Sequence, residues 1–153
     1  MDIKLLRDNA NLPTKGSEYA AGYDLYAAID KVGFDDWTTH VPIEIPPHET
    51  KMIPTGIAIA IPNGMWGGVF ARSGLATKQG LRPANCVGVI DSDYRGEIFV
   101  ALHNDTNDTR YVYDGDRIAQ LVFLPVFDEP FIIVDELDST DRGEGGFGST
   151  GTN

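Results

Sequence analysis

Helical periodicity is almost absent from this chain of 153 residues, and that absence is the strongest constraint on its fold. Short apolar or alternating runs recur instead between Gly, Pro, Asn and Asp, a pattern typical of an all-β sandwich or barrel. One helix is predicted at 73–79, with Ser73 as its N-cap and Gly80 as its stop. The predicted strands are 2–6, 23–28, 41–45, 50–61, 67–72, 86–90, 97–104, 110–113 and 117–126.

The composition indicates a soluble globular protein. A hydrophobic content of 42% excludes a disordered chain, and the length is sufficient for a proper core. No apolar run approaches the roughly 18 residues of a membrane span, and residues 1–8 lack the features of a signal peptide. We therefore expect no membrane partner and no secretion, with a location in the cytoplasm, or in the nucleus or host-cell interior for a eukaryotic or viral source.

The charge and the metal-binding residue types limit the partners. A formal net charge of −11 repels nucleic acid, whose binding depends on clustered Lys and Arg. Cys86 is the only cysteine, which excludes an intrachain disulfide and a thiolate zinc cluster. His40, His48 and His103 show no ligand spacing. A small phosphate ligand is still compatible with this chain where local charges or a metal ion offset the field, so a mononucleotide is favoured over a nucleic acid.

Residues 142–151 form a glycine-dense tail that predicts a nucleotide-binding arm. Glycine allows the backbone to bend sharply and to present N–H groups without an obstructing Cβ. Arg142, Ser149 and Thr150 suit phosphate oxygens, and Phe147 offers a face for base stacking. The alternative is a flexible tail without a function, which is common at glycine-rich termini.

Between the predicted strands and this tail, the apolar segment 131–134 is surrounded by acidic residues. It is interpreted as a last strand or docking segment, followed by an acidic hinge. An extended chain covers about 3.3 Å per residue, so the tail can reach a neighbouring subunit. The predicted organisation is a folded domain at 1–134 and an acidic hinge with a flexible arm at 135–153. The acidic residues are Asp128, Glu129, Asp135, Glu136, Asp138 and Asp141.

Two turns carry the residue types of a phosphate-transfer site. The turn 91–96 places the Asp91 carboxylate at a strand end near the Tyr94 ring, although such carboxylates commonly cap backbone N–H groups. The segment 72–76 opens the predicted helix, where N–H groups and the backbone dipole favour an anion, although an ordinary helix cap is the alternative. Asp24 and Gln120 lie on apolar strands and, taken alone, are read as structural.

Five segments, in order, resemble the five motifs of the trimeric dUTPase (deoxyuridine 5′-triphosphate nucleotidohydrolase) family. They are AGYDL (21–25), RSGLA (72–76), NCVGVIDSDYRGEI (85–98), GDRIAQLVF (115–123) and RGEGGFGSTG (142–151). Together they cover nearly the whole chain. The resemblance implies a β jelly roll (β-clip) assembled as a homotrimer with shared active sites, the C-terminal arm of each copy being swapped onto a neighbour.

The reaction that the resemblance implies is hydrolysis of dUTP to dUMP and pyrophosphate by attack of water on the α-phosphorus. It limits uracil incorporation into DNA and supplies dUMP for thymidylate synthesis. Asp91 would orient and deprotonate the water, and Mg²⁺ chelated by the triphosphate would contact Asp24 through a water. Because the reference pKa of Asp is about 3.9, most of the acceleration is expected from positioning and charge stabilisation.

The resemblance also implies how the substrate is held. Asn85 and the backbone of Gly88, Val89 and Ile90 would read the uracil edge in a slot too narrow for thymine, and Tyr94 would pack under the deoxyribose and exclude a ribose. The other implied substrate-binding residues are Phe99, then Arg72, Ser73, Gly74 and nearby Gln120 at the phosphates, and Arg142, Phe147, Gly148, Ser149 and Thr150 in the closing arm.

The chain departs from the family pattern in two places. Ala71 stands where the family usually has proline, and the segment between Ala28 and Val41 is longer than in the compact bacterial form. Residues 30–39 are read as a surface excursion, with a protein-partner site as the alternative because the segment contains Phe34 and Trp37. A dCTP deaminase is disfavoured because the 91–94 pattern is centred on aspartate rather than glutamate. The hypothesis from a different functional class is a nucleotide-gated binding protein, which engages a protein partner through the fold and the segment 30–39.

Overall fold

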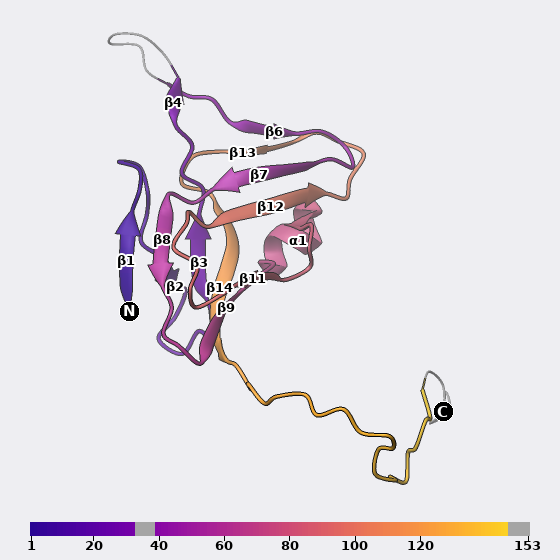
Figure 1. Ribbon diagram of the computed structural model, residues 1–153. Helices are drawn as coiled ribbons and strands as arrows, with labels where there is room; N and C mark the ends of the chain where they lie inside the picture. The colour runs from indigo at the N-terminus through magenta and orange to yellow at the C-terminus, as the bar shows by residue number, and fades with distance from the viewer. Residues whose placement is uncertain (33–38, 147–153) are drawn as a thin grey trace.

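The computed structural model describes residues 1–32 and 39–146, and it confirms an all-β jelly roll with one short helix, α1 (Ser73–Gln79) (Figure 1). The strands are β1 (Asp2–Leu5), β2 (Thr14–Lys15), β3 (Tyr23–Tyr26), β4 (Lys31–Val32), β5 (Thr39–His40), β6 (Ile43–Ile45), β7 (Thr50–Pro54), β8 (Ile57–Ala60), β9 (Met65–Phe70), β10 (Leu81–Pro83), β11 (Gly88–Ile90), β12 (Phe99–Asn104), β13 (Arg110–Val112) and β14 (Arg117–Pro125). Phe34 and Trp37 lie outside the described residues, so the partner reading of 30–39 stays a prediction.

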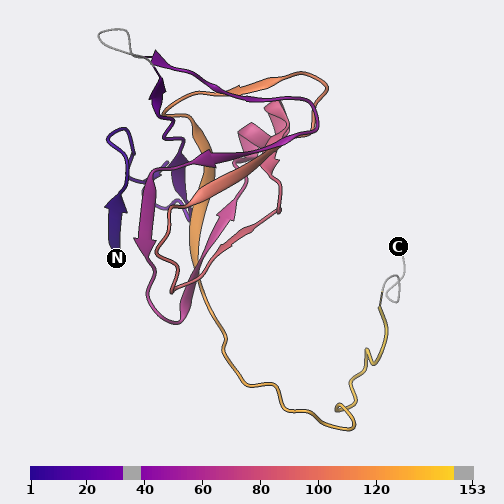
Figure 2. The ribbon, with the colours of Figure 1, turned by 45° about the horizontal axis from the view of Figure 1, so that its top comes forward.

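The strands pair antiparallel into a five-stranded sheet, a three-stranded sheet and three strand pairs. The largest sheet has the order β11-β9-β14-β3-β2, and the three-stranded sheet has the order β10-β12-β7. The pairs are β1 with β8, β13 with β6, and β4 with β5. Strand β14, the last strand of the chain, lies between β9 and β3, so strands that are far apart in the sequence are neighbours in one sheet (Figures 1 and 2).

The apolar faces of these sheets enclose one core. Leu25 on β3 and Leu121 on β14 are fully buried in it, together with Ile53 on β7 and Leu102 on β12. Burying such side chains contributes about 1.5–3 kcal/mol each relative to leaving them exposed. The core therefore holds the five-stranded and three-stranded sheets against each other and fixes the loops at their edges.

The predicted strand 50–61 is two strands, β7 and β8, separated by a corner at Gly56. This glycine has φ +68°, a conformation that residues with a Cβ rarely adopt. A Cβ there would also lie 2.7 Å from the Cβ of Ala10. The run contains Pro54 and Gly56, residues typical of turns, but the direction in which the chain leaves this corner depends on contacts with remote segments.

Helix α1 has the predicted bounds, but the prediction of Ser73 as its N-cap is wrong. Arg72 occupies the N-cap in an extended conformation and makes no side-chain cap bond, while Ser73 is the first helical residue. An arginine side chain has no acceptor and cannot cap an N–H group. The predicted stop is confirmed, since Gly80 adopts φ +66°.

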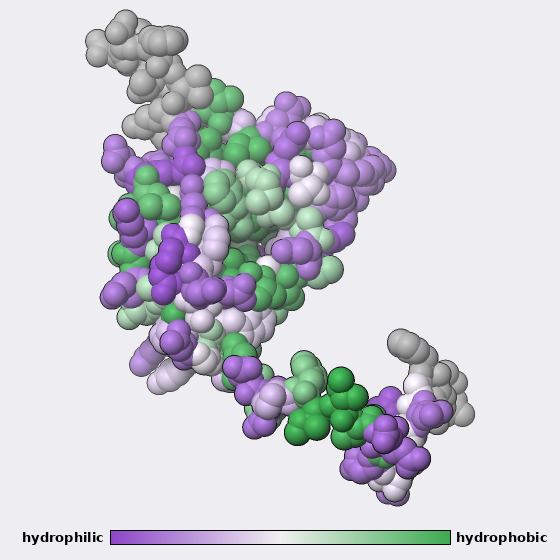
Figure 3. Space-filling view, viewed as in Figure 1, coloured by the Kyte–Doolittle hydropathy of each residue, from purple (hydrophilic) through white to green (hydrophobic). Residues whose placement is uncertain are grey.

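The segment after β14 does not form the last strand that was one reading of 131–134. No helix or strand occurs from 126 to 146, and this segment runs away from the folded body (Figures 1 and 2). Phe131 and Ile133 are fully exposed, and the space-filling view shows apolar side chains along the segment (Figure 3). A strand needs a partner for its hydrogen bonds, and the segment pairs with no strand among residues 1–32 and 39–146. The division of the chain at residue 134 stays a prediction.

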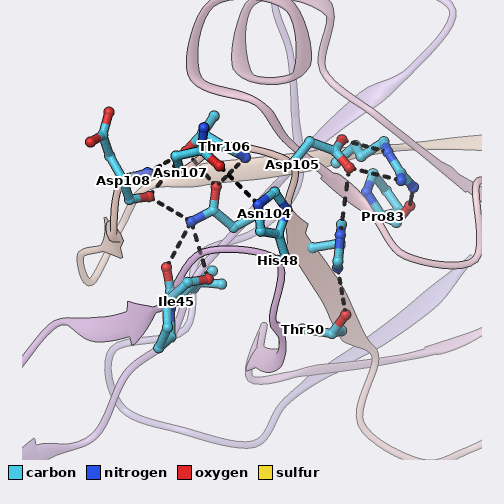
Figure 4. A network of polar contacts seen from close by, with 12 residues as sticks. Ile45, His48, Thr50, Pro83, Asn104, Asp105, Thr106, Asn107 and Asp108 are labelled. Atoms are coloured by element: carbon cyan, nitrogen blue, oxygen red, sulfur yellow. Dashed lines mark hydrogen bonds and ion pairs between the residues drawn. The ribbon is translucent and has the colours of Figure 1, made fainter.

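A buried asparagine organises the end of β12 (Figure 4). The Asn104 side chain is completely buried, and its amide nitrogen lies 2.9 Å from the Ile45 carbonyl and 2.8 Å from the Asp108 carbonyl. Its amide oxygen accepts bonds from the Thr106 backbone N–H (3.0 Å) and hydroxyl (2.7 Å). One side chain therefore ties the turn after β12 to the end of β6.

Replacing this side chain tests its role in stability. Asn104→Ala is expected to lower the free energy of unfolding by about 2–4 kcal/mol, because buried carbonyl and N–H groups lose their partners. The measurement is urea unfolding of both proteins. Asn107→Ala in the same turn is the control, since Asn107 is exposed and bonds only the His48 ring (3.0 Å), and its expected effect is about 0.5 kcal/mol or less. Equal losses in the two variants would contradict the assigned role.

Candidate active site

Strand pairing assembles one polar cluster from three separate motifs. Asp24 on β3 lies opposite Gln120 on β14, and Gln120 lies opposite Phe70 on β9. Arg72 follows Phe70 by two residues at the start of α1, so the same sheet edge carries all of these groups. Sequence reasoning placed these groups on strands and at a helix start, and the sheet order explains why they meet.

Two arginines hold the Asp24 carboxylate. Arg72 Nε lies 2.8 Å from Asp24 Oδ1, and Arg117 Nη1 lies 3.1 Å from Asp24 Oδ2. Arg72 also donates from Nη1 to the Arg117 carbonyl oxygen (3.2 Å). The Asp24 side chain is only 13% exposed, so these charge-assisted bonds are shielded from bulk water on one side. Two guanidinium groups against one carboxylate leave a local positive charge on a strongly acidic protein.

This cluster lines a cavity of about 460 Å³. Ser73 and Gly74 form part of its wall, and the position of a Gly74 Cβ has no neighbour within 4 Å, so the backbone there is open. Lys78 also lines it, one helical turn beyond Gly74. Three cationic side chains thus surround an open cavity that has one acidic side chain among its described lining residues, which suits a polyanion.

Sequence reasoning missed Arg117 and Lys78. Arg117 belongs to the 115–123 motif, but a register irregularity between Arg117 and Ala119 breaks the alternation that would have placed its side chain. Lys78 was detectable in principle, because residues four apart on a helix share a face. Both side chains lie at the cavity that the predicted phosphate residues line.

Gln120 fastens the turn that leads into α1. Its Nε2 donates to the Ala71 carbonyl oxygen at 2.9 Å. This bond holds the position where Ala71 replaces the proline of the family pattern. Gln120 therefore both lines the cavity and restrains the backbone just before Arg72.

A second cavity, of about 250 Å³, lies beside the turn 91–96, which connects β11 to β12. Asp91, Tyr94 and Phe99 line it together with Val89 and Ile90. The Tyr94 hydroxyl donates to the Glu97 carbonyl oxygen (2.9 Å), and the Tyr94 N–H bonds the Asp91 carbonyl oxygen (3.2 Å). The turn thus presents an aromatic ring next to a carboxylate, as the sequence predicted.

The Asp91 side chain is exposed and makes no hydrogen bond or ion pair to other described residues. The alternative reading, in which the Asp91 carboxylate caps a backbone N–H, therefore finds no support in this part of the chain. A carboxylate that lines a cavity and has no hydrogen-bond partner in the protein is available to accept a hydrogen bond or a proton from a water molecule. Asn85, also exposed, lies near the start of β11, with its Nδ2 3.5 Å from where a Gly88 Cβ would be.

The two cavities share no described lining residue. Within one chain, Asp91 lines one of them, and Arg72, Ser73 and Gly74 line the other. One chain therefore brings the predicted phosphate-binding residues together at one cavity and Asp91, Tyr94 and Phe99 together at another, but it does not bring the two groups together.

The predicted arm contributes no contact to either cavity among the described residues. Arg142 is exposed, and its Nε donates to the nearby Gly145 carbonyl oxygen (2.9 Å). Phe147, Gly148, Ser149 and Thr150 lie outside the described residues. Their predicted role in closing the site stays a prediction.

The described residues contain no group of three or more His, Cys, Asp or Glu side chains placed to hold a metal ion. Asp24 is the acidic residue predicted to act on magnesium, and both of its oxygens accept bonds from arginine. Direct ligation by Asp24 is therefore disfavoured, although each oxygen retains capacity for a bond from water. Among residues 1–32 and 39–146, no helix has the length and apolar character that crossing a membrane requires.

Comparisons with known proteins establish the family of this chain. The sequence pattern of the dUTPase family matches residues 8–151. Deoxyuridine 5′-triphosphate nucleotidohydrolase of Desulfitobacterium hafniense is 53% identical over 92% of this chain and 87% of its own length. The Candida albicans protein of the same name is 43% identical over 100% of this chain and 89% of its own length.

Solved structures give the same result. A mutant dUTPase of Staphylococcus bacteriophage 80alpha, solved with dUpNHpp, superposes with a TM-score of 0.84 at 27% identity, covering 99% of this chain and 98% of that one. A mutant dUTPase from phage phi11 of S. aureus shares the fold with a TM-score of 0.77 at 24% identity, covering 90% of this chain and 98% of that one. The structure of that mutant reveals how a structural Mg(II) ion is coordinated. The chain belongs to the dUTPase family.

Proposed function

We propose that this protein hydrolyses dUTP to dUMP and pyrophosphate. The observation that carries the proposal is the cavity lined by Arg72, Arg117 and Lys78, in which both arginines bond Asp24, on an otherwise acidic protein. Membership of a family whose relatives are named for this reaction supports the choice of substrate. The expected consequence in the cell is less uracil in DNA and a supply of dUMP for thymidylate synthesis.

The triphosphate binds at the first cavity in this proposal. Arg72, Arg117 and Lys78 supply charge, while Ser73 and the open backbone at Gly74 supply donors to phosphate oxygens. Asp24 keeps the Arg72 guanidinium oriented through its Nε bond, leaving other N–H groups of Arg72 for the substrate. Fixed charges of this kind stabilise phosphoryl transfer without reorganising during the reaction.

Magnesium fits this arrangement as an ion held chiefly by the triphosphate. Mg²⁺ retains much of its water shell and commonly relies on substrate phosphates, so a single protein carboxylate acting through water is sufficient. Asp24 lines the cavity proposed for the triphosphate. Because both of its carboxylate oxygens already bond Arg72 and Arg117, Asp24 would contact the magnesium ion through a water molecule. When bound, the ion would neutralise phosphate charge.

The nucleoside binds at β11 and the turn 91–96 in this proposal. The backbone of Gly88, Val89 and Ile90, with the Asn85 amide, reads the uracil edge, and Tyr94 lies under the deoxyribose. Asp91 accepts the proton of the attacking water at its exposed carboxylate, and Phe99 contributes to the cavity wall. Phe147 and its neighbours in the arm close over the bound nucleotide.

A complete site requires more than one copy of the chain. The Asp91 cavity and the Arg72 cavity are separate in one chain. A homotrimer that places the Asp91 cavity of one copy against the Arg72 cavity of another would complete the site. The exposed apolar segment 131–134 supports association, because Phe131 and Ile133 are fully exposed in the single chain and would gain burial against another copy. The third copy would supply the arm.

A steady-state assay tests the proposed reaction. With dUTP and Mg²⁺ the protein is expected to release dUMP and pyrophosphate, and with dTTP turnover is expected to fall by about 10²-fold or more because the slot excludes a methyl group. Liquid chromatography of the nucleotides measures both reactions, and ammonia release from dCTP distinguishes a deaminase. Absence of pyrophosphate from dUTP, or equal turnover of dTTP, would refute the proposal.

A further inference from the structure

A bidentate ion pair lies next to the turn 91–96 that carries Asp91 and Tyr94, because Glu97 directly follows this turn. Arg7 Nε lies 3.0 Å from Glu97 Oε1, and Arg7 Nη2 lies 3.1 Å from Glu97 Oε2. The pair is largely shielded, with the Arg7 side chain 22% exposed and the Glu97 side chain 15% exposed. Parallel bonds of this kind fix orientation as well as charge.

Both partners are themselves restrained. Glu97 Oε1 also accepts the backbone N–H of Gly56 at 2.9 Å, at the corner between β7 and β8. Arg7 also contacts the Asp30 carboxylate, and the adjacent Leu6 N–H bonds the Gly56 carbonyl oxygen at 2.7 Å. The bonds to Glu97 and then to Asp30 raise the pKa of Arg7, so its charge is secure. Glu97 is thus anchored to the N-terminal segment and to the Gly56 corner.

The anchored residue supports the Tyr94 ring. The Tyr94 hydroxyl donates to the Glu97 carbonyl oxygen at 2.9 Å. The ring crosses over Gly96, where a Cβ would lie only 2.5 Å from the hydroxyl oxygen. The position of the ring is therefore set by the backbone of Glu97, whose side chain is fixed by Arg7. Tyr94, Glu97 and Asp91 line the same cavity.

We infer that Arg7 and Glu97 are positioning residues for sugar discrimination: their ion pair holds the Tyr94 ring at the distance that admits a deoxyribose and excludes a ribose. The inference rests on the proposed function and adds two residues to it. Their effect on the sugar passes through the Glu97 carbonyl oxygen and the Tyr94 hydroxyl, because the Glu97 carboxylate is engaged by Arg7 and the Gly56 N–H. Release of the pair lets the ring move away from the sugar, so room opens for a 2′-hydroxyl.

The experiment compares kcat/KM for dUTP and for UTP in wild type, Glu97→Ala, Glu97→Gln and Arg7→Met. In Glu97→Ala and Arg7→Met the ratio of the two values is expected to fall by about tenfold or more, since displacements near 1 Å at a reacting site have effects of this size. Glu97→Gln retains an acceptor for the Gly56 N–H and is expected to fall between wild type and Glu97→Ala. This graded rescue separates positioning from general loss of structure.

Asp105→Ala is the matched control. Asp105 forms a comparable bidentate pair with Arg82, at 2.7 and 3.0 Å, and neither residue lines the Asp91 cavity. Its dUTP-to-UTP ratio is expected to stay within about twofold of wild type, because a structural pair elsewhere does not touch Tyr94. Folded Glu97 and Arg7 variants that keep the wild-type ratio would overturn the inference. A wild-type protein inactive on dUTP would instead overturn the proposed function, and this inference with it.

Discussion

Asp91→Asn is expected to lower kcat for dUTP by about 10²- to 10⁴-fold while leaving dUTP affinity close to wild type. The amide has the shape of the carboxylate but cannot accept the proton of the attacking water. Because the Asp91 side chain is exposed and bonds no other described residue, its replacement breaks no internal contact. Pyrophosphate release measures kcat, and calorimetry with a non-hydrolysable dUTP analogue measures binding.

Asp93→Asn controls for the change of charge in the same turn. Asp93 is exposed two residues further along and does not line the Asp91 cavity. Its kcat is expected to stay within about threefold of wild type, because surface substitutions away from a site have small effects. Full turnover in Asp91→Asn would remove this carboxylate from the proposed mechanism, whereas a loss of binding would move its role to substrate recognition.

Mixing two inactive variants, Asp91→Asn and Arg72→Ala, is expected to restore activity. Each variant alone should lose about 10²-fold or more in kcat, since each removes a group that acts on the reacting phosphates. The two residues line different cavities of one chain, so a shared site takes Asp91 from one copy and Arg72 from another. Mixed trimers then contain sites in which both residues are intact.

The expected recovery of activity equals the fraction of sites in which both Asp91 and Arg72 are intact. With random assembly of equal amounts, each of the two residues is intact in half of the positions, so about a quarter of the sites regain full function. The proteins are co-refolded from denaturant and assayed at equal total concentration, and each variant refolded alone provides the baseline. Activity that remains at the baseline after verified mixing would show that one chain supplies both residues.

The sequence was most informative where residue type alone dictates backbone geometry. Gly80 ends α1 as predicted because only a residue that tolerates a positive φ can occupy that position. The Asp91–Tyr94 turn was also correctly placed at the end of a strand, since turn residues followed an apolar run. Local residue type was sufficient to predict both features, although remote segments also contact Gly80, where a Cβ would lie 2.4 Å from the Thr106 side chain.

Features set by long-range contacts escaped prediction. The corner at Gly56 depends on Ala10, which crowds the position from a remote segment. Arg117 reaches Asp24 only because β14 inserts between β3 and β9. The short strands β2 and β10 have two and three residues, and neither contains an apolar run that would have marked it as a strand. Such elements are created by their partners rather than by their own sequence.

The apolar segment 131–134 also has a consequence for newly synthesised chains. An unpaired, hydrophobic stretch of this kind can stack into intermolecular β-structure before its proper docking surface is available. Asp128 and Glu129 precede it, and Asp135 and Glu136 follow it immediately. These carboxylates act as gatekeepers, since like charges would crowd together in a stacked aggregate. In the proposed homotrimer, the acidic flanks would thus limit aggregation of the segment before the subunits assemble.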